Sequence, residues 1–493
     1  MQGSMQHAPP MPAELWEQIH PHVRAVVAVI MDRQAQRIAA LETQVVELQK
    51  QIRVLRERLN QHSQNSSKPP SSDGPHVKRR PPKAPSGRKA GGQPGHPVHR
   101  RALLPREDVD EVIACPPPSC RRCGAPLSGD PDGVVRHQVV EVPPVKPHVR
   151  EYQLHRLRCG RCGVLTCGQL PAGVPAHGYG PRLASLIALC SGAYRMSKQQ
   201  VASFCREVLG VPVGASTVCK LEQRVRRALR PVVQQARAYV QLQDTNVDET
   251  PWRERARRRW LWTVVTPQVS VFQIAPTRGA PVLKELLGNF YPGLITSDRA
   301  KVYDTHPLQR RQVCWAHLRR EFQAMIDRGG AAKPVGEILL EHSTVLFAWW
   351  HQLREGIWAR ATFQWYMGGL RRSFREELER GSRCRCPKTA ATCLELLARE
   401  RALWTFVRVG GIEPTNNSAE RQLRHAVLWR KRSYGTQSHR GSRFVESILT
   451  VVSSCQQQGR NVLAYLTACC QAFDCGRVGP SLVPRTSTPL FCY

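Results

Sequence analysis

The sequence predicts an α/β protein built from several domains. Three observations lead to this prediction: a heptad pattern near the N-terminus, two CxxC motifs flanked by strand-like segments, and a C-terminal half in which strand-like and helix-like segments alternate. A chain of 493 residues has room for roughly three domains at about 150 residues each. No run approaches the ~18 consecutive apolar residues of a membrane span, so we expect no membrane-embedded segment.

Basic residues dominate the charge of the chain. Seventy-two Lys and Arg oppose 38 Asp and Glu, which leaves a net charge of +34 at pH 7. A field of this sign attracts polyanions, above all nucleic acid, and it argues against a small-molecule metabolic enzyme. The N-terminus lacks the basic start and apolar run of a signal peptide, so we expect a cytoplasmic protein. There, the 18 cysteines are expected to be metal ligands or buried thiols rather than disulfides.

Residues 31–60 carry apolar residues at the alternating spacings of a heptad repeat. β-Branched residues occupy most a positions and leucines occupy the d positions, which favours a parallel two-stranded coiled coil. The a positions are Ile38, Val45, Ile52 and Leu59, and the d positions are Leu41, Leu48 and Leu55. The other interpretation is one amphipathic helix that packs on its own domain. We favour self-association, and therefore a homodimer or a larger assembly.

Residues 61–103 form a basic, proline-rich segment that we expect to be a flexible linker. Between positions 61 and 101 it contains nine Lys and Arg, one Asp and eight prolines. Few apolar residues remain to build a core. The segment either tethers its neighbours passively or adds salt-sensitive, sequence-independent affinity for DNA.

Residues 104–176 contain two matched cysteine motifs, CRRCG and CGRCG, that predict a zinc ribbon. Two residues between the thiolates let both reach one ion, and a glycine after each pair relieves crowding in the turn. The segments VVRHQVVEV and VREYQLHRLRC between the pairs are typical of short strands. The expected ligands of one zinc ion are Cys120, Cys123, Cys159 and Cys162, with Cys115 and Cys167 as candidate substitutes. The alternative is four reduced thiols without a metal.

Residues 177–235 are expected to be helical, in three segments broken at Gly192 and at GVPVGA. Ser197 and Ser216 are the expected N-caps, and Gly210 is the expected stop of the second helix. A short turn containing glycine between two such helices suits a helix-turn-helix. An ordinary helical hairpin fits the same pattern equally well.

Residues 239–330 and 411–475 are expected to form one α/β core, interrupted by a helical, Trp-rich insertion at 331–410. VQLQDTNVDET, RWLWTVV and VSVFQIA read as strands, residues 280–287 as a helix, and GLITSD and RQVCW as short strands. Helical spacing resumes in AHLRREFQAMIDR and in NNSAERQLRHAVLWRKR. The order strand, strand, strand, helix, strand, helix, strand is that of a ribonuclease H-like core. Residues 476–493 are expected to be a disordered tail.

Two acids stand at the ends of predicted strands in this strongly basic chain. Asp248 closes the first strand and Asp298 closes the fourth, where loops expose them. Two carboxylates about 4 Å apart repel by about 4 kcal/mol at an effective dielectric near 20, so only a bound cation makes the pair tolerable. Hard oxygen ligands suit magnesium, and two such ions can assist an in-line phosphoryl displacement. Asp244 competes with Asp248 for this role.

At this point the motifs resemble the insertion-sequence sixty-six family of DDE transposases. The resemblance rests on DET at 248–250, on SD with Tyr303 after it, on CWAHLRREF from Cys314, and on NNSAERQLR from Asn416. The cysteine motifs, the segment 61–74 and the N-terminal heptads match in the same order, so the resemblance covers roughly residues 38–472. The sequence departs from the expected pattern after Asp298, where Arg299 and Ala300 replace a glycine and an aromatic residue.

The resemblance implies a catalytic triad of Asp248, Asp298 and Glu420 that binds two magnesium ions. It implies an enzyme that cuts the double-stranded DNA ends of its own insertion sequence and joins them to target DNA without a covalent intermediate. Two further small proteins encoded by the element are implied partners.

Basic residues follow Glu420 along the same predicted helix. Arg424 shares a helix face with Glu420, and the run at 430–432 could hold phosphate while the ring of Tyr434 stacks on a base. The predicted DNA-binding residues are Arg421, Arg424, Arg430, Lys431 and Arg432. A solvated basic face would have the same composition. His317 is either an ordinary helix residue or a contact to the active site or DNA.

Two sets of alternatives stay open at this stage. Glu420 fits a structural role, because Asn417 is a good N-cap and a Glu three residues later can complete a capping box; Glu413 is then the nearest other acid. The whole chain could instead be a non-catalytic zinc-ribbon DNA-binding regulator, or a metal-dependent nuclease without strand transfer. A regulator needs no carboxylates in a basic surface, whereas only a joining assay separates the nuclease from a transposase.

Overall fold

The computed structural model describes residue 15, residues 17–60 and residues 101–484. The chain divides into two units: Met1–Pro81 with Ala316–Ala398 form the first, and Pro82–Trp315 with Arg399–Tyr493 form the second. In the described ranges, no helix combines the length and the apolar character that crossing a bilayer requires.

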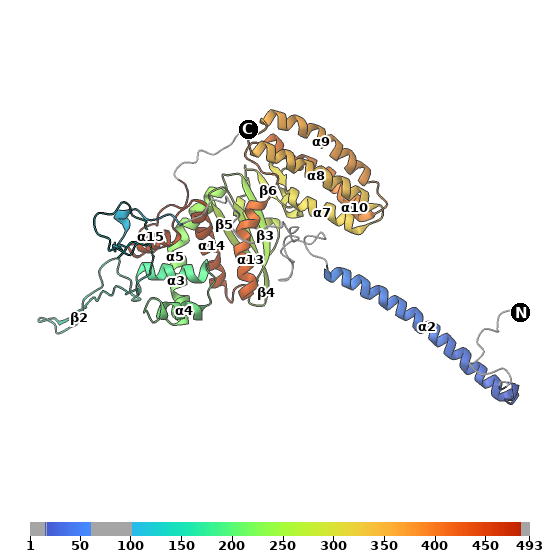
Figure 1. Ribbon diagram of the computed structural model, residues 1–493, viewed down its shortest axis with the longest axis horizontal. Helices are drawn as coiled ribbons and strands as arrows, with labels where there is room; N and C mark the ends of the chain where they lie inside the picture. Colours follow the sequence, from blue (N-terminus) through green and yellow to red (C-terminus); the bar gives the residue numbers. More distant parts are fainter. Residues whose placement is uncertain (1–14, 16, 61–100, 485–493) are drawn as a thin grey trace. The chain divides into compact units, whose positions relative to one another are not determined.

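Helix α2 (Pro21–Asn60) is continuous and contains the whole predicted heptad segment (Figure 1). It begins at Pro21, earlier than the predicted start at residue 31. The heptad residues from Ile38 to Ile52 expose about half of their surface, with Ile38 at 55% and Leu48 at 56%. The apolar stripe is therefore available for a partner. The predicted linker lies outside the described residues, except for positions 101–103.

Residues 104–176 contain one short hairpin, in which β1 (Arg156–Arg158) pairs antiparallel with β2 (Leu165–Cys167). The second cysteine motif occupies the connection between these strands. The prediction of a strand at VVRHQVVEV is wrong: residues 134–142 form none, and Val135 is 99% exposed. A segment that buries neither face gains too little free energy to offset the entropy of ordering.

Three helices confirm the helical prediction for residues 177–235. They are α3 (Pro181–Gly192), α4 (Lys198–Glu207) and α5 (Ala215–Val240). Ser197 caps α4 as predicted: its hydroxyl accepts from the Gln200 amide at 3.2 Å, and the Gln200 side chain accepts from the Ser197 amide at 2.9 Å. Gly210 follows α4 with φ +65°, as predicted for its stop. The cap position of α5 is Gly214, so the prediction of Ser216 as its N-cap is wrong.

The second unit contains a five-stranded sheet with the strand order β5-β4-β3-β6-β7. Its strands are β3 (Thr245–Glu254), β4 (Arg257–Val265), β5 (Ser270–Ala275), β6 (Ile295–Ser297) and β7 (Arg311–Val313). The first three form an antiparallel meander, whereas β6 and β7 run parallel to β3 and to each other. Thr266 closes the predicted Thr-Pro-Gln turn, since its amide donates to the Val269 carbonyl at 2.8 Å.

Helix α6 (Ala280–Leu287) confirms the predicted helix between the third and fourth strands. The predicted helix between the last two strands is wrong. Only two short 3-10 helices, η3 (Lys301–Thr305) and η4 (Leu308–Arg310), connect β6 to β7. Because β6 and β7 are parallel neighbours, they still need a crossover connection, and these 3-10 helices form part of it.

Long helices from the C-terminal part cover this sheet (Figure 1). Helix α13 (Asn417–Ser433) packs against β3 and β4, and α14 (His439–Gln457) packs against β5 and α5. Helix α15 (Val462–Asp474) packs against α3 and α5. Buried apolar residues of these helices and of the sheet form one continuous core. Of the two segments predicted as one core, residues 239–315 and 411–475 lie in the second unit, whereas residues 316–330 belong to the first.

The chain after α15 differs from the predicted disordered tail. Leu482 is fully buried, and its carbonyl accepts from the Gln458 side chain at 2.8 Å. The Tyr465 hydroxyl donates to the Pro480 carbonyl at 2.7 Å. An apolar residue at position 482 was enough to dock the segment on the core, although prolines and serines surround it. Residues 485–493 lie outside the described ranges.

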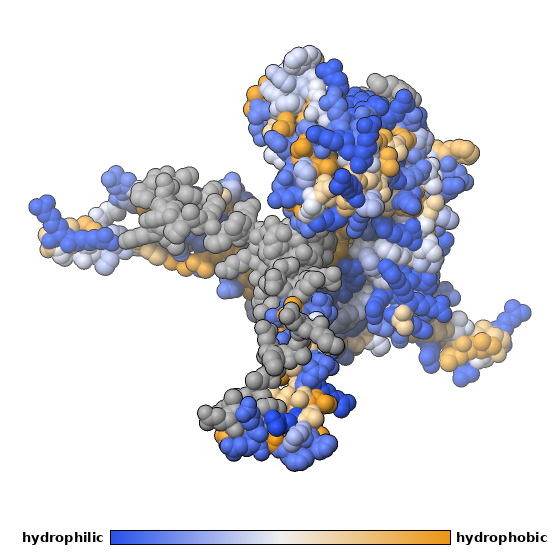
Figure 2. Space-filling view, turned by 90° about the vertical axis from the view of Figure 1, so that its right-hand side faces the viewer, coloured by the Kyte–Doolittle hydropathy of each residue, from blue (hydrophilic) through white to orange (hydrophobic). Residues whose placement is uncertain are grey.

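Residues 331–398, most of the segment predicted as a helical insertion, are helical and lie in the first unit. Its helices are α8 (Ala332–Arg354), α9 (Arg360–Gly381) and α10 (Pro387–Ala398), and they follow α7 (Trp315–Arg328), whose first turn holds His317. A Cβ at Gly336 would come within 2.7 Å of the Phe322 carbonyl, so α7 and α8 approach closely there. Short helices α11 (Glu400–Leu403) and α12 (Thr405–Arg408) return the chain to the second unit. Hydrophilic residues cover most of the face that Figure 2 shows, in keeping with the charged composition.

Candidate active site

Asp248 lies on β3, and Asp298 directly follows β6, the parallel strand next to it. In the pairing of β3 with β6, Thr245 lies opposite Ile295 and Asn246 opposite Thr296. The same register, continued by two residues, sets Asp248 beside Asp298, and adjacent strands are about 4.8 Å apart. Asp298 directly follows β6 as predicted, but β3 continues to Glu254, so the prediction that Asp248 closes its strand is wrong.

Glu420 reaches the same place from the first turn of α13. The Asn416 side chain donates to the Val247 carbonyl at 2.8 Å and accepts from the Asn246 side chain at 3.0 Å. These two bonds hold the start of α13 against β3, next to Asp248. The pKa of Asp248 is raised well above its usual value, first by burial and then by the negative charges of Glu249, Asp298 and Glu420. All three acids of the predicted triad therefore share one electrostatic environment.

The capping alternative for Glu420 is wrong. Helix α13 begins at Asn417, and the cap position is Asn416, whose side chain makes no capping bond. Glu420 is consequently the fourth residue of the helix rather than the third, where a capping box requires its acid. The Asn416 side chain binds β3 instead of the helix. The sequence suggested a cap because either asparagine suits that position, and only the contact with β3 distinguishes them.

The two competing acids lie in other surroundings. Asp244 precedes β3, and its carboxylate accepts from the Leu294 amide at 2.7 Å, which fastens the start of β3 to the approach of β6. Burial raises the pKa of Asp244, but the charges that raise the pKa of Asp248 do not include it. Glu413 is exposed ahead of α13. Neither acid displaces a member of the triad.

Glu249 is buried next to the triad and is held by two groups. Its side chain is 0% exposed and accepts from the guanidinium of Arg278 and from the hydroxyl of Tyr303. Burial nevertheless raises the pKa of Glu249 above its usual value. Arg278 also donates to the Asp298 carboxylate at 3.4 Å, and its guanidinium lies 5.3 Å from the ring centroid of Trp260. Arg278 therefore connects the buried acid to the triad.

Sequence reasoning missed Arg278, because a single arginine in the loop after β5 carries no local signal. The departure at Arg299 and Ala300 has little effect on Asp298. The backbone amide of Ala300 donates to the Asp298 carboxylate at 2.8 Å. A backbone amide can make this hydrogen bond whichever side chain position 300 carries.

The predicted DNA-binding residues all lie on α13, but they differ in exposure. Arg421, Arg424, Lys431 and Arg432 are exposed. Arg430 is partly buried, and its guanidinium donates to the Thr250 hydroxyl at 2.9 Å and to the Pro251 carbonyl. Burial lowers the pKa of Arg430 from its usual value. Its contacts thus tie α13 to β3.

Each cysteine motif forms a tight turn around its first thiol. The Gly124 amide donates to the Cys120 carbonyl and the Gly163 amide to the Cys159 carbonyl, both at 2.9 Å. Backbone amides of the following residues, Cys123 in one motif and Cys162 in the other, lower the pKa of Cys120 and of Cys159. Both motifs thus favour the thiolate that a metal requires. In the described ranges, however, the four sulfurs do not gather within 4.8 Å of one another.

The chain matches the Transposase IS66 family over residues 177–443, more than half of its length. It belongs to this family. The match spans the helices α3–α5, the sheet with its three acids, and α13. Residues 14–102, which include α2, match a family of unknown function (DUF6444).

Two curated relatives come from Sinorhizobium fredii, and both are uncharacterized. Protein y4hP is 25% identical to this chain, and the match covers 72% of the chain and 71% of y4hP. Protein y4qI is also 25% identical, but the match covers 44% of each protein. The chain thus spans less than half the length of y4qI. Family membership supports a role in DNA transposition.

Proposed function

We propose that this protein is a DDE transposase that cuts the double-stranded DNA ends of its own insertion sequence and joins them to target DNA. The observation that supports the proposal is that Asp298 and Glu420, from two other segments, are among the negative charges that act on the buried Asp248. A strongly basic protein has no structural need for such mutually repelling acids. The strand order β5-β4-β3-β6-β7, with its antiparallel meander and two parallel strands, supports a ribonuclease H-like core.

The three acids offer the hard oxygen ligands that magnesium prefers. Burial raises the pKa of Asp248 first, and the negative charges of Glu249, Asp298 and Glu420 add to it; a bound cation would offset these charges. Asp248, Asp298 and Glu420 would hold two magnesium ions, whose chemistry is to activate the attacking oxygen and stabilise the leaving one. Asn416 keeps Glu420 beside β3, and Arg278 keeps Glu249 and Asp298 in place. Exposed Arg421, Arg424, Lys431 and Arg432 extend the site with cations for the DNA backbone.

The proposal is tested with duplexes that carry the candidate element ends, taken from the DNA that flanks the gene. The full-length protein is incubated with these duplexes, magnesium and a target plasmid. We expect both cleaved ends and joined products, and we expect neither with Asp248→Asn. Asp244→Asn is the matched control. Asp244 precedes the same strand and accepts a hydrogen bond from the Leu294 amide, so this substitution should leave activity largely intact.

The other functions give different results in the same assay. Cleavage without joining would make the protein a metal-dependent nuclease. Binding without cleavage by the parent protein would make it a DNA-binding regulator. Equal loss of activity in both variants would argue against the assignment of Asp248.

Residues 104–176 are proposed to form a zinc ribbon that binds one ion through Cys120, Cys123, Cys159 and Cys162. The support is local: two identical turns, each with a lowered thiol pKa, flank a short hairpin. Closed sets of four cysteine thiolates are typical of structural zinc sites. Zinc analysis of protein purified without chelator should find one ion per chain.

Helix α2 is proposed to make the protein a dimer or a larger assembly. The half-exposed stripe from Ile38 to Ile52 supports this, because the a and d residues of a coiled coil are buried only by a partner helix. The family resemblance also suggests two small element-encoded proteins as partners.

Leu48→Lys should reduce the sedimentation mass to that of a monomer, because each partner would place a charge in the apolar seam. Thr43→Lys is the matched control on the outer face of the same helix and should leave the mass unchanged. An unchanged mass in Leu48→Lys would mean that α2 packs within its own chain.

A further inference from the structure

A cleft of about 930 Å³ opens within the second unit. One wall comes from the start of α4 and from α5, and the other from the end of α13 and the segment that leads into α14. Of the residues named in the proposed function, Arg432 alone lines this cleft. Its basic lining residues are Arg195, Lys198, Lys220, Arg227, Arg432 and Arg440.

The charge of the cleft is almost entirely positive. Its one acid, Glu222, is buried and already paired with Lys198. Among the described residues, the other five cations of the lining have no carboxylate partner. The pKa of the neighbouring Arg226 is lowered by burial and then by the positive charges of Arg227 and Arg440, among others. Cations on opposite walls therefore repel one another, and an anion between them would relieve the repulsion.

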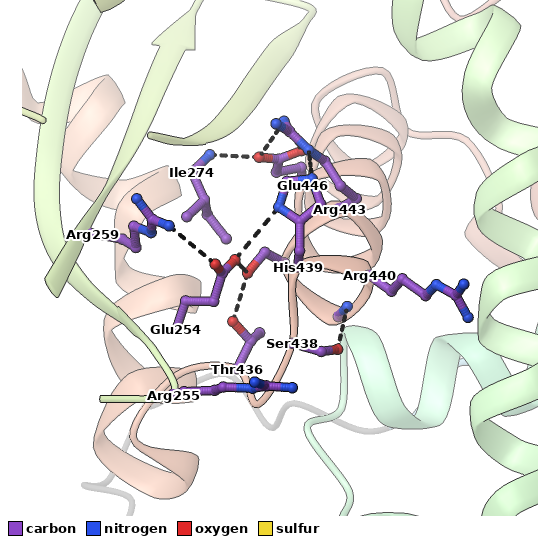
Figure 3. Close-up of polar contacts among 12 residues, drawn as sticks. Glu254, Arg255, Arg259, Ile274, Thr436, Ser438, His439, Arg440, Arg443 and Glu446 are labelled. Carbon is purple, nitrogen blue, oxygen red and sulfur yellow. Dashed lines mark hydrogen bonds and ion pairs between the residues drawn. The ribbon is translucent and has the colours of Figure 1, made fainter. Parts of the chain in front are cut away.

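Two acids, Glu254 and Glu446, fix the start of α14, which forms part of one wall. Glu254 accepts from the Ser442 hydroxyl at 2.6 Å and pairs with Arg259, while Glu446 accepts from the Ile274 amide at 2.7 Å and pairs with Arg443. Figure 3 shows these contacts between the sheet and the first turns of α14. They neutralise the arginines that face the sheet.

Arg440 takes no part in that network. Figure 3 shows its side chain extending away from the contacts of Glu254 and Glu446. The Gln223 side chain on α5 donates to the Arg440 carbonyl at 3.2 Å, which sets this turn of α14 against the other wall. The cation is thus displayed on a fixed backbone rather than on a free loop.

Polar donors accompany the cations. Both α4 and α14 begin at the cleft, with Ser197 and Ser438 as their caps, so the positive ends of two helix dipoles lie along it. Arg195 is held at φ +59°, and in the described part of the chain its Nη1 is shielded from solvent and has no hydrogen-bond acceptor. A shielded N–H without an acceptor is costly, and an anion in the cleft would supply the acceptor.

We propose that this cleft binds the phosphate backbone of double-stranded DNA and thereby positions the duplex that the three acids cut. The inference rests on the proposed function for its choice of polymer. The cations come from several segments of the fold, and a duplex with one charge per ~1.7 Å of its axis can meet several at once. Such contacts fix register and orientation rather than read bases.

The test uses the full-length double variant Arg227→Gln/Arg440→Gln, which removes one exposed cation from each wall. The control, Arg182→Gln/Arg477→Gln, removes two exposed arginines that do not line the cleft. Binding of an unrelated duplex is measured in chelator over a range of salt. We expect the slope of log K against log salt to become shallower by about 1.8 for the cleft variant, at about 0.9 per phosphate contact, and to stay constant for the control.

A third variant, Arg227→Lys/Arg440→Lys, keeps both positive charges and should therefore keep the slope of log K against log salt. If it does, the shallower slope of the Gln variant comes from lost phosphate contacts and not from lost folding. Equal slopes in the parent and the Gln variant, or equal losses in the Gln variant and the control, would overturn the proposal. So would an RNA duplex that binds better than DNA, or displacement of DNA by inorganic phosphate beyond the effect of KCl at equal ionic strength. Chelator prevents cleavage, so these outcomes are independent of whether the three acids cut DNA.

Discussion

Burial differs greatly between the two parts of the second unit that carry predicted metal ligands. Around the triad, Val247 and Trp252 on β3 expose none of their surface. In residues 104–176, Cys123, Cys159 and Cys162 are exposed, and Val135 is 99% exposed. The core therefore holds the acids in place, whereas short backbone turns alone shape the cysteine motifs. We expect the acids to meet before any metal binds, and the two cysteine motifs to be joined by zinc itself.

The largest effect is expected from Glu420→Gln. This variant tests whether the core holds the three acids in place before a metal binds. Gln keeps the volume but removes the charge, and a metal held between carboxylates and phosphate contributes several kcal/mol of transition-state stabilisation. Cutting and joining should fall on the order of a thousandfold, while melting temperature and DNA binding stay close to the parent. Gel assays of cleavage and joining, with a thermal melt, measure both.

Glu413→Gln is the control for that experiment, because it removes an exposed acid shortly before the same helix. Its activity should match the parent. If Glu420→Gln also lost its fold, the core would not hold the acids independently, and the contrast with the cysteine motifs would fail.

Cys120→Ser tests whether zinc joins the two cysteine motifs. Apparent binding energies of about 10 to 16 kcal/mol per structural zinc are folding energy for such modules. We expect zinc content to fall from one ion per chain to near zero and residues 104–176 to become protease-sensitive, while the sheet melts as before. Cys115→Ser should retain zinc. Loss of zinc in that variant instead would make Cys115 a ligand.

The sequence predicted the elements that burial controls. Periodicity identified α3, α4, α5 and the meander, and Asp248, Asp298 and Glu420 were named from motifs before their register was known. Burial also explains two errors: β3 extends past Asp248 because its continuation is covered on one side by α13, and Leu482 docks although prolines surround it.

What the sequence could not predict are contacts between distant segments. Arg278 and the cleft cations other than Arg432 have no local pattern, since their partners lie in other elements. The strand expected at VVRHQVVEV failed for the opposite reason, because its alternating pattern finds no surface to cover. A periodic segment predicts a strand only where the fold supplies that surface.

Arg278→Gln should reveal how much the preformed site depends on one cation. Glu249, 0% exposed, would lose its charged donor, which costs about 1 to 3 kcal/mol of folding stability. The guanidinium is 40% exposed, so solvent screening keeps the cost below the ~3 to 5 kcal/mol of a fully buried pair. Chemical denaturation measures the change. Arg258→Gln is the control, because Arg258 lies 5.1 Å from the same Trp260 ring without holding Glu249. Equal losses would assign the effect to the ring contact.

The smallest effect should come from Gly163→Ala, which isolates the backbone turn of one cysteine motif. Gly163 has φ +73°, and a Cβ there would meet nothing within 4 Å. The substitution therefore adds no clash, only the cost of about 1 to 2 kcal/mol for a left-handed conformation. Because the turn aligns Cys159 and Cys162, this cost should appear as a zinc affinity weakened about five- to thirtyfold.

Gly160→Ala is the matched control for that last variant, since Gly160 lies in the same motif, also has open space around it, and does not adopt the left-handed conformation. Its zinc affinity should equal that of the parent in a competition titration with a chelating dye. If both variants bind zinc like the parent, the turn contributes nothing to ligation, and the thiols alone organise the site. If only Gly163→Ala weakens binding, the left-handed turn contributes to zinc affinity. The turn of each motif is then formed before the motifs are joined. Zinc has only to bring together two turns that each already present their thiolates.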